Sequence, residues 1–193
     1  TEAIEASIKI ARRYFHSSEN FSHKTEILSF SGSFHGRTIG ALAAGGPDKL
    51  SSFNTTVNDF KFLEFGDHEQ LQNSIGEKTA AVIIEPIARN MGFIEPNINF
   101  LKELRNLCTK NKTILIFDEV MTGFRVARGG VQELLGVTPD LTALGKIVGG
   151  GLPVGVYGGR AEIMNNISPD GPVYQAGTLS GNPIAVSAGT ALL

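Results

Sequence analysis

Apolar positions recur with two different periods along this sequence. At the start they fall three or four residues apart, which predicts an amphipathic helix over residues 2–15. The same spacing predicts a second long helix over residues 97–110, with Cys108 on its buried stripe. Continuous apolar runs at residues 79–84 and 113–117 instead predict strands that are covered on both faces.

Shorter elements lie between these long ones. The patterns predict helices at residues 38–44 and 67–74 and strands at residues 26–30, 57–62 and 140–144. Because strands and helices alternate, the expected fold class is α/β, a mostly parallel sheet flanked by helices. Both chain ends fall inside helical patterns. We therefore expect residues 1–193 to form one domain that is incomplete at both ends.

Composition narrows the class of protein. Hydrophobic residues make up 41% of the chain and its net charge is −2, which excludes a disordered chain. The sequence has no apolar run long enough to span a membrane, and its pI near 6.1 does not favour nucleic acid. The single cysteine excludes a disulfide framework and fits a reducing compartment. These features predict a cytoplasmic protein without a nucleic-acid or membrane partner.

Acidic residues directly follow the two strands with continuous apolar runs. Glu85 comes after one run, and Asp118 and Glu119 come after the other. Ligands of open parallel sheets bind beyond the carboxyl ends of the strands, although an acid there commonly caps the next turn. A carboxylate behind so apolar a strand is costly without a cationic partner. Lys146, after the next predicted strand, is the candidate for that partner.

Lys146 is surrounded by glycines and has two interpretations. It is either a solvated loop residue or an amine nucleophile that a dry pocket keeps partly deprotonated for Schiff-base chemistry. The glycine run over residues 145–159 matches neither the P-loop nor the dinucleotide-binding pattern, so we expect tight turns or close backbone packing there. The four histidines lack metal-ligand spacing, and only His35 follows a strand where a site can form.

Three segments together carry a specific resemblance: Asp118–Arg125, Pro139–Lys146 and Gly177–Pro183. They resemble the class III, fold-type I pyridoxal-phosphate aminotransferases, and the resemblance covers essentially the whole chain. It implies that residues 1–193 are the cofactor-binding large domain of that family. An N-terminal segment and a C-terminal small domain would then lie outside the chain.

Two subfamilies share this resemblance. From about Ile87 onward the chain resembles glutamate-1-semialdehyde 2,1-aminomutases, including Met121 where the transaminases usually have glutamine. Arg89 departs from that pattern, which usually has glycine. The first part, with Phe34-His-Gly-Arg-Thr38, resembles acetylornithine-type aminotransferases. Either a mosaic with a junction near residues 80–90 or one divergent subfamily accounts for the two resemblances.

The resemblance implies a role for each matching residue. Lys146 would hold pyridoxal 5'-phosphate as a Schiff base, and Asp118 would pair with the pyridine nitrogen and keep it protonated. Val120 and Phe34 would cover the two faces of the cofactor ring. Glu85 would pair with an arginine of the C-terminal domain.

The remaining expected contacts concern the phosphate, the partner subunit and the substrate. Thr1 matches a phosphate-binding threonine at a helix N-terminus, and His35 belongs to the expected cofactor site. Thr178 matches a threonine that reaches the cofactor phosphate of the neighbouring subunit, which implies a homodimer. The arginine that binds the carboxylate of an amino-acid substrate is expected outside the chain. Arg125 and Arg128 lie near the site in sequence, but surface salt bridges explain them equally well.

These observations leave three hypotheses for function. The first is an aminomutase that moves the amino group within glutamate-1-semialdehyde to give 5-aminolevulinate for porphyrin biosynthesis, with Lys146 moving the protons. The second is an acetylornithine or ω-amino acid aminotransferase that uses 2-oxoglutarate as external acceptor. The third is an inactive cofactor domain, since a chain without its flanking segments would leave apolar surface exposed and the site open.

Overall fold

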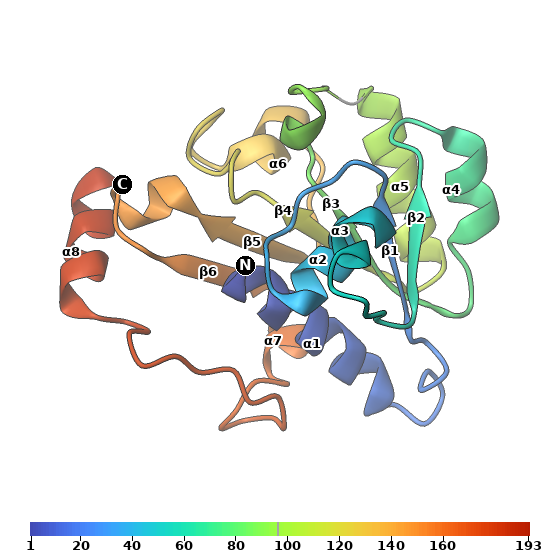
Figure 1. The fold of residues 1–193 in the computed structure, drawn as a ribbon, viewed down its shortest axis with the longest axis horizontal. Coiled ribbons are helices and arrows are strands. Elements are labelled where there is room, and N and C mark those ends of the chain that lie inside the picture. The colour runs from blue at the N-terminus through green and yellow to red at the C-terminus, as the bar shows by residue number, and fades with distance from the viewer. Residues whose placement is uncertain (96) are drawn as a thin grey trace.

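A six-stranded sheet organises the chain (Figure 1), which is described here from a computed structural model of residues 1–95 and 97–193. The strand order is β2-β1-β3-β4-β5-β6. Strands β1 to β5 are parallel, and β6 pairs with β5 in the antiparallel sense. The strands are β1 (Glu26–Phe30), β2 (Phe60–Leu63), β3 (Thr79–Ile84), β4 (Ile114–Asp118), β5 (Leu141–Gly145) and β6 (Gly155–Gly159).

Helices connect the strands and cover both faces of the sheet. Within the ranges just given, no helix is both long and apolar enough to cross a membrane. The α-helices are α1 (Glu2–His16), α2 (Ile39–Gly45), α3 (Pro47–Ser51), α4 (His68–Ser74), α5 (Ile98–Lys110), α6 (Gly130–Leu135), α7 (Ala161–Met164) and α8 (Pro183–Leu192). Two 3-10 helices are η1 (Arg89–Met91) and η2 (Lys146–Gly149).

Alternate side chains of the central strands form two hydrophobic cores. In β4, Ile114 and Ile116 pack in the core that contains α1, whereas Leu115 and Phe117 pack in the core that contains α4 and α5. This alternation follows from the two-residue period of a strand. The sheet is therefore the middle of three layers. Asp118, the last residue of β4, continues the row of Ile114 and Ile116 on the α1 face.

Most of the predicted elements are confirmed, and Cys108 is fully buried in the core as expected. The strand β2 begins at Phe60, later than the predicted residue 57, and β5 ends on Gly145. The final helical pattern is confirmed as α8.

Several short elements were not predicted from the sequence. One is α3, which begins at Pro47 because proline fits the first turn of a helix, where its missing N–H is not needed. The glycine-rich segment after Lys146 contains β6, whose sequence has no apolar alternation to reveal it. Close packing explains one glycine of β6: a Cβ on Gly159 would lie 2.0 Å from the Asp140 carbonyl oxygen.

The order of the strands creates a switch point between β1 and β3. The chain leaves β1 for β2 on one side and then crosses back to β3 on the other side. The loops that follow β1 and β3 therefore diverge, and a crevice opens between them at the carboxyl edge of the sheet. At this edge Glu85 directly follows β3, and Asp118 is the last residue of β4.

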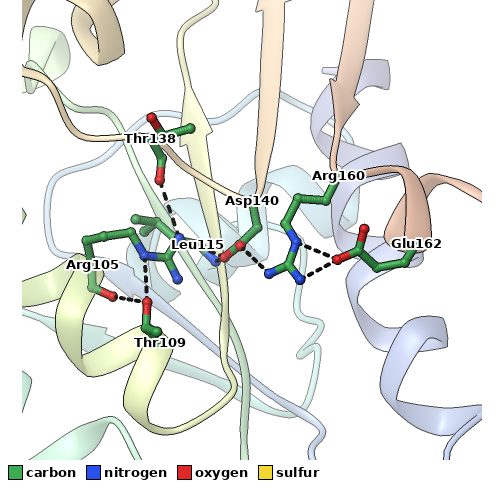
Figure 2. A network of polar contacts seen from close by, with 7 residues as sticks. All are labelled: Arg105, Thr109, Leu115, Thr138, Asp140, Arg160 and Glu162. Atoms are coloured by element: carbon green, nitrogen blue, oxygen red, sulfur yellow. Dashed lines mark hydrogen bonds and ion pairs between the residues drawn. The ribbon is translucent and has the colours of Figure 1, made fainter.

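A polar network fastens the amino end of β5 to its neighbours (Figure 2). The Asp140 carboxylate is 7% exposed and accepts hydrogen bonds from the Leu115 N–H at 2.7 Å and from the Arg105 and Arg160 guanidinium groups at 2.8 and 3.0 Å. Arg160 also pairs with Glu162. One buried carboxylate thus joins α5, β4 and the end of β6.

We predict that Asp140→Asn lowers the free energy of unfolding by about 2 kcal/mol, because the neutral amide leaves two guanidinium groups without their charged acceptor. Urea unfolding followed by circular dichroism measures this. Glu162→Gln is the matched control and should leave the midpoint unchanged, since its pair with Arg160 is exposed. Equal effects of the two substitutions would contradict the prediction that the buried Asp140 carboxylate stabilises the fold more than the exposed Glu162 does.

Candidate functional site

The carboxyl ends of β3, β4 and β5 and the loop after β1 line a cavity of about 140 Å³. A second cavity of about 470 Å³ adjoins it and shares Thr1, Val120 and Lys146 with it. The smaller cavity brings together seven of the predicted site residues, from segments far apart in the sequence: Thr1, Phe34, His35, Glu85, Asp118, Val120 and Lys146.

Asp118 lies in the wall of the smaller cavity with both carboxylate oxygens engaged. Its side chain is 5% exposed. One oxygen pairs with His35 Nδ1 at 2.8 Å, and the other accepts a hydrogen bond from the Val120 N–H at 3.1 Å. The loop after β1 thus brings His35 to Asp118, and Lys146, the cationic partner expected for the acids at the strand ends, lines the same cavity without an ion pair to Asp118.

His35 is held in place by a chain of hydrogen bonds. The Ser29 hydroxyl donates to the Ala44 carbonyl oxygen at 2.6 Å and lies 3.3 Å from His35 Nε2. Since the single Ser29 proton is used on Ala44, the remaining role for the serine oxygen is to accept the Nε2 proton of His35. A hydrogen bond from His35 Nδ1 to the Asp118 carboxylate then requires a proton on Nδ1 as well, because a carboxylate only accepts. The backbone of α2 thereby orients the carboxylate through two side chains.

The two adjacent acids after β4 have different roles. Glu119 is fully buried and accepts hydrogen bonds from the Val131 N–H at 2.7 Å and from the Thr122 hydroxyl at 2.8 Å. It therefore satisfies the first turn of α6, as the capping interpretation anticipates. Gly130, at φ +72°, permits this approach, because a Cβ there would lie 2.2 Å from a Glu119 carboxylate oxygen.

Glu85 is buried at the end of β3 and holds the loop that follows β1. Its carboxylate accepts the Phe34 N–H at 2.8 Å. Burial raises the pKa of Glu85 above its usual 4.5, and the hydrogen bond from Phe34 opposes this change. The Phe34 ring lies beneath the Arg37 guanidinium, at 5.0 Å. The predicted arginine partner of Glu85 would lie outside the chain.

Lys146 has a strained backbone and an unusual environment. Its φ of 51° lies in the left-handed region, which side-chain-bearing residues seldom adopt and which is frequent at functional sites. The residue is exposed between the two cavities, yet desolvation lowers the pKa of Lys146 from its usual 10.5. The positive charge of Arg89 lowers this pKa further, and the Asp118 carboxylate opposes the change. Desolvation and the charge of Arg89 thus both favour the deprotonated amine that a nucleophile requires.

Thr1 marks the start of α1 at the junction of the two cavities. Its side chain makes no capping hydrogen bond to the helix, and its hydroxyl oxygen accepts the Arg37 N–H at 3.4 Å. Thr1, Glu2 and Ala3 all line the larger cavity, so the free amides of the first turn lie beside it. Gly36, at φ +137°, allows this contact, because a Cβ there would lie 2.5 Å from the Thr1 hydroxyl oxygen.

Thr178 does not join the other predicted residues. It is exposed and lines neither cavity, although Gly177, Leu179 and Ser180 line the larger one. The segment that carries Thr178 passes along the outside of the domain before α8 (Figure 1).

Sequence reasoning did not assign a role to three residues of the site. Ser29 was signalled only by its hydroxyl within an apolar strand, and Arg37 by its place in the His-Gly-Arg segment. Arg89 was noted for replacing a glycine. It begins η1 and lines the smaller cavity, and it is not among the described residues with positive φ, so the replacement does not strain the loop.

The side chains around the two cavities suit pyridoxal phosphate. They offer an amine, a carboxylate held by an imidazole, the apolar side chains of Val120 and Phe34, and free helix amides for a phosphate group. In the part of the chain that the structure describes, no group of three His, Cys, Asp or Glu side chains is placed to hold a metal ion.

Comparison with known proteins agrees with this chemistry. The family model "Aminotransferase class-III" matches residues 1–193. The chain is 47% identical over 204 residues to a glutamate-1-semialdehyde 2,1-aminomutase of Rhodopirellula baltica, covering 100% of this chain and 45% of that protein. It is 48% identical over 200 residues to the Francisella tularensis protein of the same name, covering 98% of this chain and 45% of that protein.

Solved structures of related enzymes share the fold. An ω-transaminase from Sphaerobacter thermophilus superposes with a TM-score of 0.83 at 34% identity, over 97% of this chain and 46% of that one. A β-phenylalanine aminotransferase from Variovorax paradoxus superposes with a TM-score of 0.82 at 35% identity, over 99% of this chain and 43% of that one. The chain thus spans less than half the length of these relatives, and the named aminomutases match both halves of it.

The environment of Lys146 predicts an unusual titration. Labelling by an amine-directed reagent should reach its half-maximal rate at a lower pH for Lys146 than for the exposed Lys102, because burial and Arg89 disfavour the protonated amine. Arg89→Gln should move the Lys146 midpoint upward, since it removes a nearby positive charge. Peptide mass spectrometry after pulses at different pH values measures both. Coincident midpoints for Lys146 and Lys102 would contradict the lowered pKa of Lys146.

Proposed function

Since the chain belongs to the class III aminotransferase family, we propose that it forms the pyridoxal-phosphate-binding domain of a glutamate-1-semialdehyde 2,1-aminomutase. The observation that carries this proposal is the identity of about 47% to relatives of that name over the whole chain. Met121 supports it, because this thioether lines the smaller cavity where a transaminase is expected to have a hydrogen-bonding glutamine.

The cofactor supplies the electron sink, and the residues of the chain supply its placement. When bound, pyridoxal phosphate absorbs the negative charge that develops on the carbon next to the transferred nitrogen. Class III aminotransferases and these aminomutases depend on it. In this chain the Asp118 carboxylate would face the ring nitrogen and keep a proton on it. His35 would stop that carboxylate from turning away, since it binds the other side of the same group.

Lys146 performs the proton transfers in this proposal. A lysine of lowered pKa can accept a proton from substrate carbon and return it to another position, because its neutral amine is more accessible than that of an ordinary lysine. Lys146 has a left-handed backbone and lines both cavities. Val120 and Phe34 would exclude water from the two faces of a flat ring.

A second candidate function is an ω-amino acid or acetylornithine-type transaminase. The solved structures at TM-scores of 0.82 and 0.83 favour it, because they belong to an aminotransferase and an ω-transaminase. The two functions differ in one requirement. A transaminase consumes an external acceptor such as 2-oxoglutarate, whereas an aminomutase returns the nitrogen to the same carbon skeleton.

The decisive experiment supplies glutamate-1-semialdehyde to the purified, cofactor-loaded protein. We expect 5-aminolevulinate to form without added 2-oxoglutarate, because the nitrogen stays within the substrate. Strict dependence on 2-oxoglutarate would instead favour the transaminase.

Borohydride reduction before proteolysis provides the control for cofactor binding. It should give a pyridoxyl adduct on Lys146 in the wild type and none at that position in Lys146→Ala. A wild type without any such adduct would indicate the inactive cofactor domain.

We also propose that two copies of the chain complete each other's sites through Thr178. This hydroxyl lines neither cavity of its own chain, and it lies on an exposed segment with large apolar side chains that are unusual for a free surface. Leu179 is 69% exposed and Ile184 is 75% exposed. A second copy packed on this segment would bury both and would bring Thr178 to the phosphate end of the neighbouring cavity.

Complementation between two variants tests the shared site. Thr178→Ala should weaken cofactor binding about tenfold, since a hydrogen bond to a phosphate is lost, and Thr178→Ser should not. Mixed dimers of Thr178→Ala and Lys146→Ala chains should regain one intact site, seen as adduct formation with the affinity of the wild type. If Thr178 acts within its own chain, the mixture regains none. Sedimentation measures the oligomeric state of each variant.

A further inference from the structure

Arg89 is a cation without an anionic partner in the smaller cavity. It projects from η1, directly beyond the carboxyl end of β3, and is partly buried. It lines the cavity together with Lys146 and Asp118. Among the described residues, its guanidinium makes neither an ion pair nor a hydrogen bond. A desolvated guanidinium normally pairs with a carboxylate or phosphate, because its five N–H groups lose their water.

The carboxylates of the cavity are already committed elsewhere. Glu85 accepts the Phe34 N–H, and Asp118 binds His35 and the Val120 N–H. Neither acid lies within ion-pair distance of Arg89. The other arginine in the cavity wall, Arg37, is more exposed and stacks over the Phe34 ring. The Arg37 side chain also makes no ion pair with any described residue, so Arg89 is the less exposed of two guanidinium groups in this cavity that remain available for a ligand.

The charge of the cavity also favours an anion. Arg37 and Arg89 contribute positive charge, Asp118 is paired with His35, and burial raises the pKa of Glu85, the other carboxyl group of the cavity. The positive charge of Arg89 lowers the pKa of Lys146. Arg89 and Lys146 line the same cavity of about 140 Å³, so an anionic group bound on Arg89 would place the neighbouring substrate atoms in the cavity that holds the amine.

We infer that Arg89 binds a carboxylate of the amino-acid substrate and so selects an anionic substrate for this site. The inference rests on the proposed function, because it places the substrate in the cavity that would hold the cofactor. It assigns to Arg89 a specificity role that a glycine at this position could not perform.

The phosphate of the cofactor is the other anion that could occupy Arg89. The arrangement of the sheet favours the substrate. Arg89 follows β3, whereas the free amides at the start of α1 line the larger cavity together with Gly145 and Gly155 of β5 and β6. A phosphate on those amides would lie toward β5 and β6. The opposite side of the cavity, toward β3, is then left for the substrate.

A binding experiment with a substrate-like carboxylate separates these possibilities. Glutarate carries two carboxylates and no transferable nitrogen, and glutaramide is its neutral counterpart of the same shape. Calorimetric titration of the purified protein, with and without cofactor, should show that glutarate binds and glutaramide does not. Arg89→Gln should weaken glutarate binding about tenfold to a hundredfold, because a charge-assisted pair is lost.

Two further variants serve as controls. Arg89→Lys should retain part of the affinity, since the charge remains but the bidentate geometry is lost. Arg128→Gln removes an exposed arginine that lines neither of the two site cavities, and it should leave glutarate binding unchanged. The cofactor dissociation constant, measured by fluorescence, should change less than about twofold in all three variants.

Several results would overturn the inference. Unchanged glutarate affinity in Arg89→Gln would do so, as would an equal loss in Arg128→Gln or an absence of glutarate binding in the wild type. A loss of cofactor affinity with unchanged glutarate binding would assign Arg89 to the phosphate instead. Failure of the proposed function is distinguishable, because it appears as a missing Lys146 adduct, which the titration without cofactor does not require.

Discussion

The buried pair between Asp118 and His35 is the constraint on which the site depends. A carboxylate at the end of an apolar strand is unstable unless a donor accompanies it, and here the donor comes from a loop that follows a different strand. This requirement ties the loop after β1 to the end of β4. Phe34 and Gly36 flank His35, so the same tie places an aromatic ring in the cavity wall and brings the backbone against the start of α1.

Glu85 strengthens this arrangement from the third strand. It holds the Phe34 N–H, so the loop after β1 is anchored across the switch point to two strands, at β3 through Glu85 and at β4 through Asp118. Both acids bind groups of the loop after β1, and neither forms an ion pair with an arginine or lysine of the cavity. As a result, the positive groups that line the cavity stay free for ligands, and Lys146 lies in an environment that disfavours its protonated form.

Glycine allows the backbone to approach neighbouring groups closely at a few places in this fold. Gly36 allows the loop to reach Thr1, Gly130 allows α6 to begin on Glu119, and Gly159 allows β6 to pair tightly beside Asp140. Gly159 belongs to the glycine run over residues 145–159, where the sequence predicts close backbone packing. The same run shows why β6 was not predicted, since a strand made largely of glycine has no side-chain pattern to read.

The sequence by itself determined the elements with strong periodicity and the class of chemistry. Buried runs and amphipathic helices are local patterns, so β3, β4, α1 and α5 could be read directly, and the lysine and acid motifs indicated the enzyme family. The tertiary structure alone decided which groups pair. It matched Asp118 with His35 instead of Lys146, separated Glu119 from Asp118, and left Arg89 without an anion in the cavity. Pairing depends on distances between loops that are remote in sequence, and the order and spacing of the strands set those distances.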